Sequence, residues 1–425
     1  RLPDAYEATV GEVFPQTAPG NFSHVPAMDG WVWTTFYPFQ WDLNYTHPPV
    51  FAAMASAMLQ LANRGVEVFR LDSAPFLWKR LGTDCLNQPE VHAVLAALRA
   101  CTALVTPGVL LKAEAIVPAG QVMPYFGDDQ RRGRECQLAY HSSLMASAWA
   151  ALAEGHAGLP RQLLAQTPAL PPGTGWVTYV RCHDDIVWGV LRPLVESAGG
   201  DFHERIGRIA AFLEGRVPGS FARGAAFQTG DPRSTHGSNG MTASLVGLPD
   251  DPAATPDPAA LRRYVLLHAL ALWVGAVPLL YMGDELGQGN NHDAADAARL
   301  ALDGRWLQRP HLSDASLAQL ARQCGVPAAT FTALGELSAA RRDERFPADA
   351  AAVPVDTGDP ALLALRRGDD ALALFHFGHQ ASTLNLDELG MPADLVDVFA
   401  CGVAGEGSSR TLQPWSTLWL FRIGG

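Results

Sequence analysis

The chain has 425 residues, of which 48% are hydrophobic and 17% are charged, and its formal net charge is −12. This length predicts one large domain with a small one, or two to three modules, and the composition is that of a folded globular protein rather than a disordered one. The negative charge and the lack of a Lys/Arg-rich run argue against a nucleic-acid partner, which usually needs a basic patch. Neutral substrates fit better.

The cysteines are scattered along the chain without a C-x-x-C motif: Cys85, Cys101, Cys136, Cys182, Cys324 and Cys401. This pattern indicates a reducing compartment, so we expect a cytoplasmic protein without a metal cluster or a disulfide framework. The longest apolar stretch, 266–282, is interrupted by His268, Gly275 and Pro278. A membrane span needs about 18 to 20 apolar residues, so none is predicted.

The central part of the chain repeats a helix-like stretch, a turn and an apolar, β-branched run. Thr46 is the expected N-cap of a helix that has Pro48 and Pro49 in its first turn and stops at Gly65. Further helices are expected at 89–101, 142–154 and 261–274. Strands are expected at 66–71, 109–113, 136–140, 176–181 and 277–282. Such units predict a parallel sheet with right-handed crossovers, either part of a barrel or an open doubly wound sheet.

The texture changes towards the end of the chain. Short alternating runs at 362–366, 371–377, 395–399 and 416–423 predict a small antiparallel β domain. Before it, the segment 188–240 is rich in Gly and Arg and weakly periodic, so it is predicted to be a long excursion between a strand and a helix.

Acidic residues follow three of the expected strands, namely Asp72, Glu114 and Asp184. In parallel α/β folds ligands bind at the carboxyl ends of the strands, so we expect the three acids to converge on one mouth. Side chains two positions apart share a face of a strand, which places Arg70 beside Asp72 and Lys112 beside Glu114.

This set of residues suits retaining glycosidic bond exchange. In that reaction an ionised carboxylate attacks the anomeric carbon, and a carboxylic acid about 5 Å away protonates the leaving oxygen. Arg70 would favour the charged form of Asp72, whereas Glu114, expected among apolar neighbours, would hold its proton longer. His183 and Asp184 would hold sugar hydroxyls and offset the developing positive charge. For each acid taken singly, the alternative is capping of the next helix or pairing with an arginine.

Other positions give weaker signals. Aromatic residues near Gln40 and Asp42 are candidates for a sugar-stacking rim, with core packing as the alternative: Phe36, Trp41 and Tyr45. The stretch 303–306 is a candidate site or a surface turn, and 281–285 is expected to serve structure through hydrogen bonds at a barrel rim.

The three strand ends resemble the core motifs of the α-amylase superfamily, glycoside hydrolase family 13: Phe-Arg70-Leu-Asp72, Lys112-Ala-Glu114-Ala-Ile and Val-Arg181-Cys-His183-Asp184-Asp185. Further stretches resemble its amylosucrase and sucrose hydrolase branch: 33–36, 39–45, 76–79, 81–83, 219–224, 278–285 and 305–306. Related trehalose synthases carry other residues around the acid and the last Asp, so the sucrose-cleaving branch is preferred.

The resemblance implies a (β/α)8 TIM-barrel type fold with a small antiparallel C-terminal β domain. Residues 1–44 do not supply the Asp and His that close the family's donor pocket, so we expect barrel strands 4–8 alone, in an N-terminally incomplete barrel. The expected domains are 1–46, the end of the loop domain after barrel strand 3; 47–186, barrel strands 4–7; 187–252, an inserted loop subdomain; 253–348, strand 8 and the last helices; and 349–425, a β-sandwich-like domain.

The resemblance also implies a role for each matching residue. Asp72 is the expected nucleophile, Glu114 the general acid and then base, and Asp184 the transition-state stabiliser. The residues expected to grip the glucosyl ring are Arg70, His183 and Arg305. Those expected around the fructosyl or acceptor side are Phe36, Gln40, Phe76 and Asp185. No metal or other cofactor is implied.

Sucrose would thus donate glucose to Asp72 and release fructose, and an α-glucan would accept the glucosyl unit. A sucrose hydrolase, with water as the acceptor, is the first alternative. It is favoured where the chain departs from the family, because Gly237 falls at the position of an acceptor-binding arginine. An inactive carbohydrate-binding fragment is the second alternative, because strands beside a gap would have unpaired edges. The expected partners are sucrose and α-glucan or other small carbohydrates, without nucleic acid or membrane.

Overall fold

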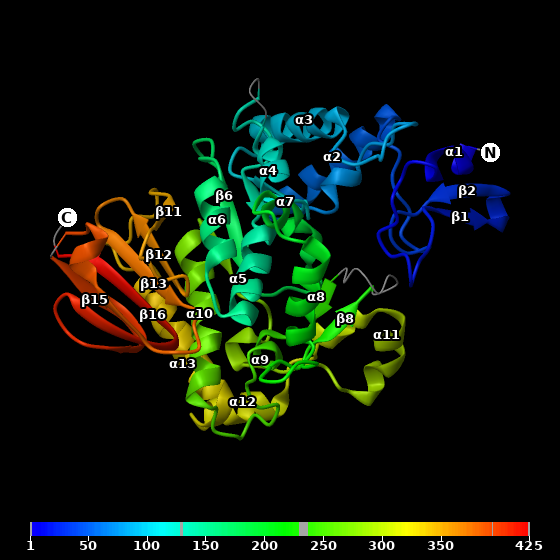
Figure 1. Cartoon of the computed structure of the whole chain (residues 1–425). Helices are drawn as coiled ribbons and strands as arrows, with labels where there is room; N and C mark the ends of the chain where they lie inside the picture. The colour runs from blue at the N-terminus through cyan, green and yellow to red at the C-terminus, as the bar shows by residue number, and fades with distance from the viewer. Residues whose placement is uncertain (1, 128–130, 229–236, 393, 424–425) are drawn as a thin grey trace. The chain divides into compact units, whose positions relative to one another are not determined.

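The computed structural model describes residues 2–127, 131–228, 237–392 and 394–423 (Figure 1). They divide into two compact units. The first unit comprises Arg1–Tyr140 and Pro168–Trp176, and the second comprises His141–Thr167 and Val177–Gly425. This division does not test the domain limits expected from the sequence, which stay predictions. Among the described residues, no helix has the length and apolar character that crossing a membrane requires.

The first unit is built on parallel strands. They are β3 (Val68–Leu71), β4 (Leu110–Ala113) and β5 (Leu138–Tyr140). In this register Arg70 lies opposite Lys112, and Lys112 lies opposite Leu138. The start of β6 (Gly175–Tyr179) continues the sheet, because the Gly175 amide donates to the Gln137 carbonyl. The strands predicted from apolar, β-branched runs are therefore confirmed, each within two or three residues at its ends.

Helices and a hairpin complete the first unit. The helices are α1 (Leu2–Glu7), α2 (Pro48–Ala62), α3 (Pro89–Val105), α4 (Ala119–Val122) and the 3-10 turns η1 (Pro26–Met28), η2 (Ala74–Phe76) and η3 (Met123–Phe126). The hairpin pairs β1 (Phe22–Val25) with β2 (Gly30–Trp33). Val91, Leu95 and Leu98 recur at helical spacing on α3 and are buried in the same core cluster as Leu111 and Ala113 of β4. Burial of this stripe explains why α3 forms here.

The predicted cap of α2 is wrong. His47 is the N-cap and makes no side-chain capping bond, whereas the Thr46 hydroxyl donates to Asn44 Oδ1 at 2.6 Å. Pro48 and Pro49 open the helix and have no N–H groups, so a capping side chain has fewer donors to satisfy.

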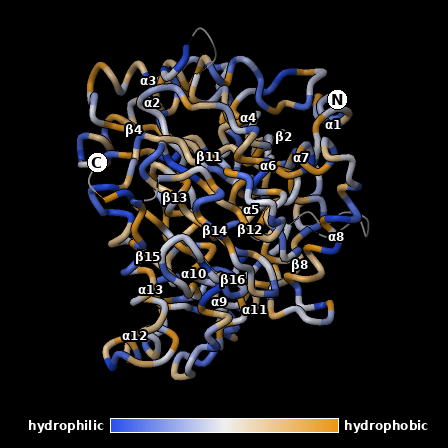
Figure 2. The backbone as a smooth tube through the Cα atoms, turned by 60° about the vertical axis from the view of Figure 1, so that its left-hand side comes forward, coloured by the Kyte–Doolittle hydropathy of each residue, from blue (hydrophilic) through white to orange (hydrophobic). Residues whose placement is uncertain are grey.

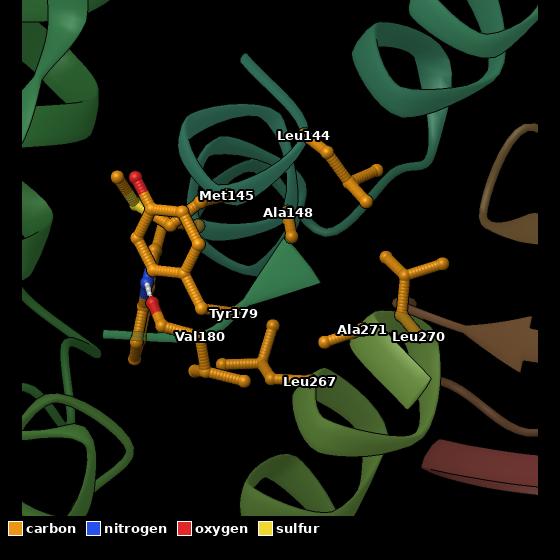
Figure 3. Close-up of a pocket in the computed structure, with 9 residues that line it drawn as sticks. Leu144, Met145, Ala148, Tyr179, Val180, Leu267, Leu270 and Ala271 are labelled. Carbon is orange, nitrogen blue, oxygen red and sulfur yellow. Dashed lines mark hydrogen bonds between the residues drawn. The ribbon is translucent and has the colours of Figure 1, made fainter. Parts of the chain in front are cut away.

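The second unit also contains paired parallel strands. The end of β6 pairs with β10 (Val277–Leu279), with Val177 opposite Val277, and the His141 amide donates to the Val177 carbonyl. The adjoining helices α5 (Ser142–Glu154) and α10 (Pro258–Val274) are buried on almost every side, which is typical of apolar helices in a large core. Figure 2 colours the chain by the hydropathy of each residue, with hydrophobic residues in orange. A cavity of about 10 Å³ lies between α5, β6 and α10. It is lined by apolar side chains such as Leu144, Leu267 and Leu270 (Figure 3).

The remaining elements of the second unit follow in chain order. The helices are α6 (Gly158–Gln166), α7 (Arg192–Ser197), α8 (Phe202–Leu213), α9 (Thr242–Leu245), α11 (Ala297–Leu302), α12 (Asp314–Ala321) and α13 (Gly325–Arg341). The 3-10 turns are η4 (Trp188–Leu191), η5 (Asp284–Leu286), η6 (Ala294–Asp296), η7 (Gly304–Gln308) and η8 (Leu386–Leu389). A small antiparallel sheet has the order β7 (Ile186–Val187), β9 (Gly237–Asn239) and β8 (Ala225–Phe227).

The segment 188–240 does lie between the strands β6 and β7 and the long helix α10, as expected, but its first half contains the helices α7 and α8. Residues 229–236 lie outside the described residues. Helix α8 starts at an N-cap, where the Asp201 side chain accepts from the Glu204 amide at 2.9 Å. Phe202, Ile206 and Ile209 are buried at helical spacing along it. The pattern was present in the sequence, but the surrounding Gly and Arg residues concealed it.

The predicted C-terminal antiparallel domain is confirmed. Its sheet has the order β11 (Ala352–Val355), β12 (Leu362–Arg367), β13 (Ala371–His376), β16 (Ser409–Arg422) and β14 (Ser382–Asn385), and β15 (Leu395–Ala404) also pairs with β16. The sheet packs on α10, where Arg367 donates to the Trp273 carbonyl and the rings of Trp273 and Trp419 lie 5.1 Å apart. Strands β11 and β14 were not predicted, because each is a four-residue strand at a sheet edge.

Candidate active site

The first candidate cluster lies where β3 and β4 end. Leu71 and Ala113 are opposite each other in the parallel register, so the next residues, Asp72 and Glu114, emerge at the same edge of the sheet. The Glu114 amide donates to the Leu71 carbonyl at 3.0 Å, which extends the pairing by one residue. Adjacent strands are about 4.8 Å apart, so this register brings the two acids close together.

Arg70 contacts both acids. Its Nη1 donates to Asp72 Oδ1, and its Nη2 lies 3.8 Å from Glu114 Oε1. The guanidinium also lies over the Tyr140 ring, 6.0 Å from the centroid, and the same ring receives Lys112 Nζ at 4.6 Å. Burial lowers the pKa of Arg70, but Glu114 and Asp72 outweigh burial and raise it above its ordinary value. The expected contact between Arg70 and Asp72 is confirmed.

Glu114 is held by polar groups that the sequence did not predict. Its Oε2 accepts from the Ser73 amide at 2.6 Å, and its carbonyl accepts from the Ala74 amide at 3.1 Å. Ser73, which supplies this amide, has a left-handed φ of 50°, a conformation that is uncommon for residues other than glycine. The Glu114 side chain is 11% exposed and that of Asp72 is 66% exposed. The chain thus presents one sheltered and one open carboxylate at the same arginine.

The second candidate cluster lies in the second unit, beyond the end of β6. Arg305 Nη1 donates to Asp184 Oδ1 at 2.9 Å, and its other nitrogens bind Asp303 at 2.8 to 3.2 Å. His183 Nε2 lies 3.2 Å from Asp184 Oδ2, and Arg309 Nη2 lies 3.6 Å from Asp184 Oδ1. Burial lowers the pKa of Arg305, but Asp303 and Asp184 raise it overall. The surface-turn alternative for 303–306 is wrong, because Asp303 is 6% exposed and Arg305 organises the cluster.

Asp185 has a different environment from Asp184. Asp185 is 6% exposed, and within the described residues its Oδ2 has no hydrogen-bond partner. Burial, followed by the charge of Asp184, raises the pKa of Asp185 to about 7, although Arg305 and Arg181 oppose the shift. A Cβ atom at Gly237 would lie 1.9 Å from Asp185 Oδ2, so a glycine is needed where Asp185 packs.

The predicted acceptor-side aromatics of the first unit are in contact. Phe36 follows β2 and Phe76 ends η2, and their rings meet edge to face with centroids 5.6 Å apart. Gln40 is exposed, and its Oε1 accepts from the Tyr37 amide at 3.3 Å. Trp41, also named as a rim candidate, is 53% exposed.

The interpretation of 281–285 as structural is supported. Glu285 Oε2 accepts from the Gly283 amide at 2.9 Å, and the Tyr264 hydroxyl donates to the Asp284 carbonyl. These bonds fix the backbone that follows β10.

One group of side chains has the types that bind metals. The ligand atoms of Cys182, His183 and Asp184 lie within 4.8 Å of one another. Burial, with a contribution from Asp184, raises the pKa of the Cys182 thiol to about 12. A metal at this position would have to displace the thiol proton, because metals bind the thiolate.

The chain is similar to several curated proteins and solved structures. No protein-family model matches the chain. Over 278 residues, 65% of this chain, it is 31% identical to the trehalose synthase/amylase of Mycobacterium tuberculosis. Over 400 residues, 92% of this chain, it is 26% identical to the glucosylglycerate phosphorylase of Escherichia coli. The crystal structure of sucrose 6F-phosphate phosphorylase from Thermoanaerobacter thermosaccharolyticum aligns with a TM-score of 0.65 and 18% identity, over 88% of this chain and 69% of that one.

These similarities support the resemblance to the GH13 α-amylase family that the sequence motifs carry. The chain spans 41% of the length of the trehalose synthase/amylase and 66% of the glucosylglycerate phosphorylase. The structural likeness, the parallel strands and the antiparallel C-terminal sheet together confirm the expected fold, with barrel strands 4–8 and a β domain. The amylosucrase and sucrose hydrolase branch stays a prediction.

Proposed function

We propose that this chain is a GH13 enzyme that carries out retaining α-glucosyl transfer, with Asp72 as the nucleophile and Glu114 as the general acid and base. The observation that supports it most directly is the Arg70 guanidinium, which contacts both carboxylates at the ends of adjacent parallel strands. Retaining enzymes need two carboxyl groups roughly 5 Å apart, and neighbouring strands provide that spacing.

The reaction has two steps. In the first, Asp72 attacks the anomeric carbon while the glycosidic bond breaks, and Glu114 gives its proton to the leaving oxygen. In the second, Glu114 takes the proton of an acceptor hydroxyl, and that oxygen displaces Asp72 from the β-glucosyl ester. Arg70 holds Asp72 through a hydrogen bond to Oδ1, and the Ser73 amide fixes the direction of Glu114.

The remaining candidates have supporting roles in this proposal. Asp184, held by Arg305, stabilises the positive charge that develops at the anomeric carbon. His183 and Arg305 bind hydroxyls of the glucosyl ring, as Arg70 does. The residues on the leaving-group and acceptor side are Phe36, Gln40, Phe76 and Asp185.

We infer sucrose as the donor, with release of fructose. An α-glucan is the proposed acceptor, and water is the alternative. The likeness to glucosylglycerate phosphorylase along 92% of the chain favours a further candidate, in which inorganic phosphate accepts the glucosyl unit. These functions share the donor step and differ only in the group that attacks the glucosyl-Asp72 ester.

The test is to incubate the protein with sucrose alone, with a maltooligosaccharide, and with inorganic phosphate. Fructose without equal free glucose, together with a lengthened glucan, supports transfer. Equal fructose and glucose means that water is the acceptor, and glucose 1-phosphate indicates phosphorolysis. Absence of fructose in every mixture would refute the proposed donor step, and sucrose binding without turnover would favour a carbohydrate-binding protein. Asp72→Asn is the inactive control, and Asp250→Asn, in an exposed ion pair with Arg223, is the active one.

A further inference from the structure

Lys79 belongs to a polar and aromatic cluster that the proposed reaction does not use. Its Nζ donates to Asp42 Oδ2 at 2.7 Å and to Thr35 Oγ1 at 3.2 Å, and lies 4.6 Å from the Trp33 ring centroid. The side chains of Lys79 and Asp42 are only 15% and 16% exposed. An ion pair this sheltered loses more when one partner is removed than a surface pair does.

Asp42 closes the loop that follows β2. Its Oδ1 accepts from the Thr35 amide at 3.1 Å, and its Oδ2 accepts from the Thr35 hydroxyl at 2.6 Å. The Asp42 amide donates to the Trp33 carbonyl at 2.9 Å, and Trp33 Nε1 donates to Thr35 Oγ1 at 3.0 Å. Hydrogen bonds within residues 33–42 thus hold the loop in one conformation, and Lys79 is the cation that binds it.

Lys79 lies on the segment that follows the proposed nucleophile, Asp72, in the chain. This segment begins at Ser73, whose amide binds Glu114, and contains Phe76. Phe36, on the loop closed by Asp42, packs edge to face on Phe76, and Lys79 Nζ lies 5.8 Å from the Phe76 ring. The ion pair therefore joins the segment that carries Phe36 to the segment that carries Phe76, and the second segment starts directly after Asp72.

We propose that the Lys79–Asp42 ion pair is a positioning device that sets the acceptor side of the reaction, by holding Phe36 against Phe76 beside the nucleophile turn. This inference rests on the proposed function. Neither residue touches the reacting atoms in this proposal. They act through the two phenylalanines, so their loss changes which acceptor reaches the glucosyl-enzyme more than it changes donor cleavage.

The test uses Lys79→Met, which keeps the length of the side chain and removes its charge, and Lys79→Arg, which keeps the charge. Fructose release measures donor cleavage, and the ratio of transfer products to free glucose measures the choice of acceptor. We expect Lys79→Met to change this ratio by about 10-fold or more, because misplacement by about 1 Å has effects of that size, and Lys79→Arg to restore part of it. If Lys79→Met does not fold, Lys79→Met combined with Asp42→Asn removes both charges and takes its place.

A matched control is available in the second unit. Arg205 and Glu154 form an ion pair with the same 2.7 Å separation and side chains that are 19% and 16% exposed. Glu154→Gln should lower the thermal midpoint by an amount similar to Lys79→Met and leave the product ratio unchanged. Equal product ratios in wild type, Lys79→Met and Glu154→Gln would overturn the positioning role and reduce the pair to a stabilising one.

A binding measurement separates this inference from the proposed function. Calorimetry with fructose and with a maltooligosaccharide reports the acceptor side without turnover. If wild type binds these sugars but does not cleave sucrose, the proposed function fails, and the positioning role still predicts at least 10-fold weaker binding by Lys79→Met than by Glu154→Gln. Equal affinities, or no binding by the wild type, would overturn it.

Discussion

Replacing Asp185 with Asn is expected to stabilise the second unit, and to do so more at pH 8 than at pH 5. Asp185 is buried, its Oδ2 has no hydrogen-bond partner among the described residues, and its pKa is raised from 3.8 to about 7. Burial is the largest cause of the shift, and the negative charge of Asp184 adds to it. The ionised carboxylate is therefore less favourable in the folded chain than in the unfolded one.

The sign and size of the effect follow from the two pKa values. The unfolded carboxyl ionises near its ordinary value of 3.8 and the folded one near 7, so between them the folded state keeps a proton that the unfolded state has lost. The free energy of unfolding accordingly falls as the pH rises from about 4 to about 7, and does not recover above that. A shift of about three units corresponds to about 4 kcal/mol in total, of which about 2 to 3 kcal/mol is lost between pH 5 and pH 8.

The assay is urea unfolding of wild type and Asp185→Asn at both pH values. Asn has almost the same shape and does not ionise, so the advantage of the variant should grow by about 2 to 3 kcal/mol from pH 5 to pH 8. Asp250→Asn, which removes an acid from the exposed pair with Arg223, controls for a general effect of charge. An advantage for Asp185→Asn that is the same at both pH values would refute the reasoning, because the Asp185 carboxyl would then not be what titrates.

Three further outcomes are expected. Glu114→Gln should keep sucrose binding in calorimetry and lose about 100-fold or more of the fructose release rate, because the amide has no acidic proton to give. An unchanged rate would remove Glu114 from the mechanism. Gly237→Ala should lower the thermal midpoint, because its Cβ would lie 1.9 Å from Asp185 Oδ2, and an unchanged midpoint would mean that Asp185 moves aside freely. Leu270→Ala, which enlarges the cavity of about 10 Å³ beside α10, should cost about 2 to 5 kcal/mol in urea unfolding, whereas a cost near zero would show that the core collapses around it.

The parallel strands and the acids at their ends could be predicted because both depend on short local patterns. An apolar, β-branched run identifies a strand, and the residue after it lies at the carboxyl edge whatever surrounds it. Helix α5 was predicted with its bounds at Ser142 and Glu154, because Gly155 ends it in a left-handed conformation with φ 71°. Helix α8 shows the opposite case, since a clear apolar period was overlooked in a segment of unusual composition.

The environment of each acid could not be predicted, because it depends on backbone conformation and on distant residues. Ser73 supplies an amide to Glu114 from a turn in which its own φ is positive, and serine rarely adopts this conformation, so the sequence does not predict it. Arg309, which lies 3.6 Å from Asp184, is 125 residues further along the chain, and no sequence pattern links the two residues. The polar contacts of Glu114 could not be predicted for the same reason.

Arg70 and Arg305 show how far local reasoning reaches. Arg70 is two residues before Asp72 on one strand, so strand geometry alone placed the pair on one face, and the sheet register then added Glu114. Arg305 is 121 residues after Asp184, and only tertiary structure makes them partners. In each unit a guanidinium contacts two carboxylates: Arg70 contacts Asp72 and Glu114, and Arg305 contacts Asp184 and Asp303. The positive charge offsets the repulsion between the two carboxylates. Removal of either arginine should therefore disturb both of its acids together, whereas removal of one acid leaves the other acid paired.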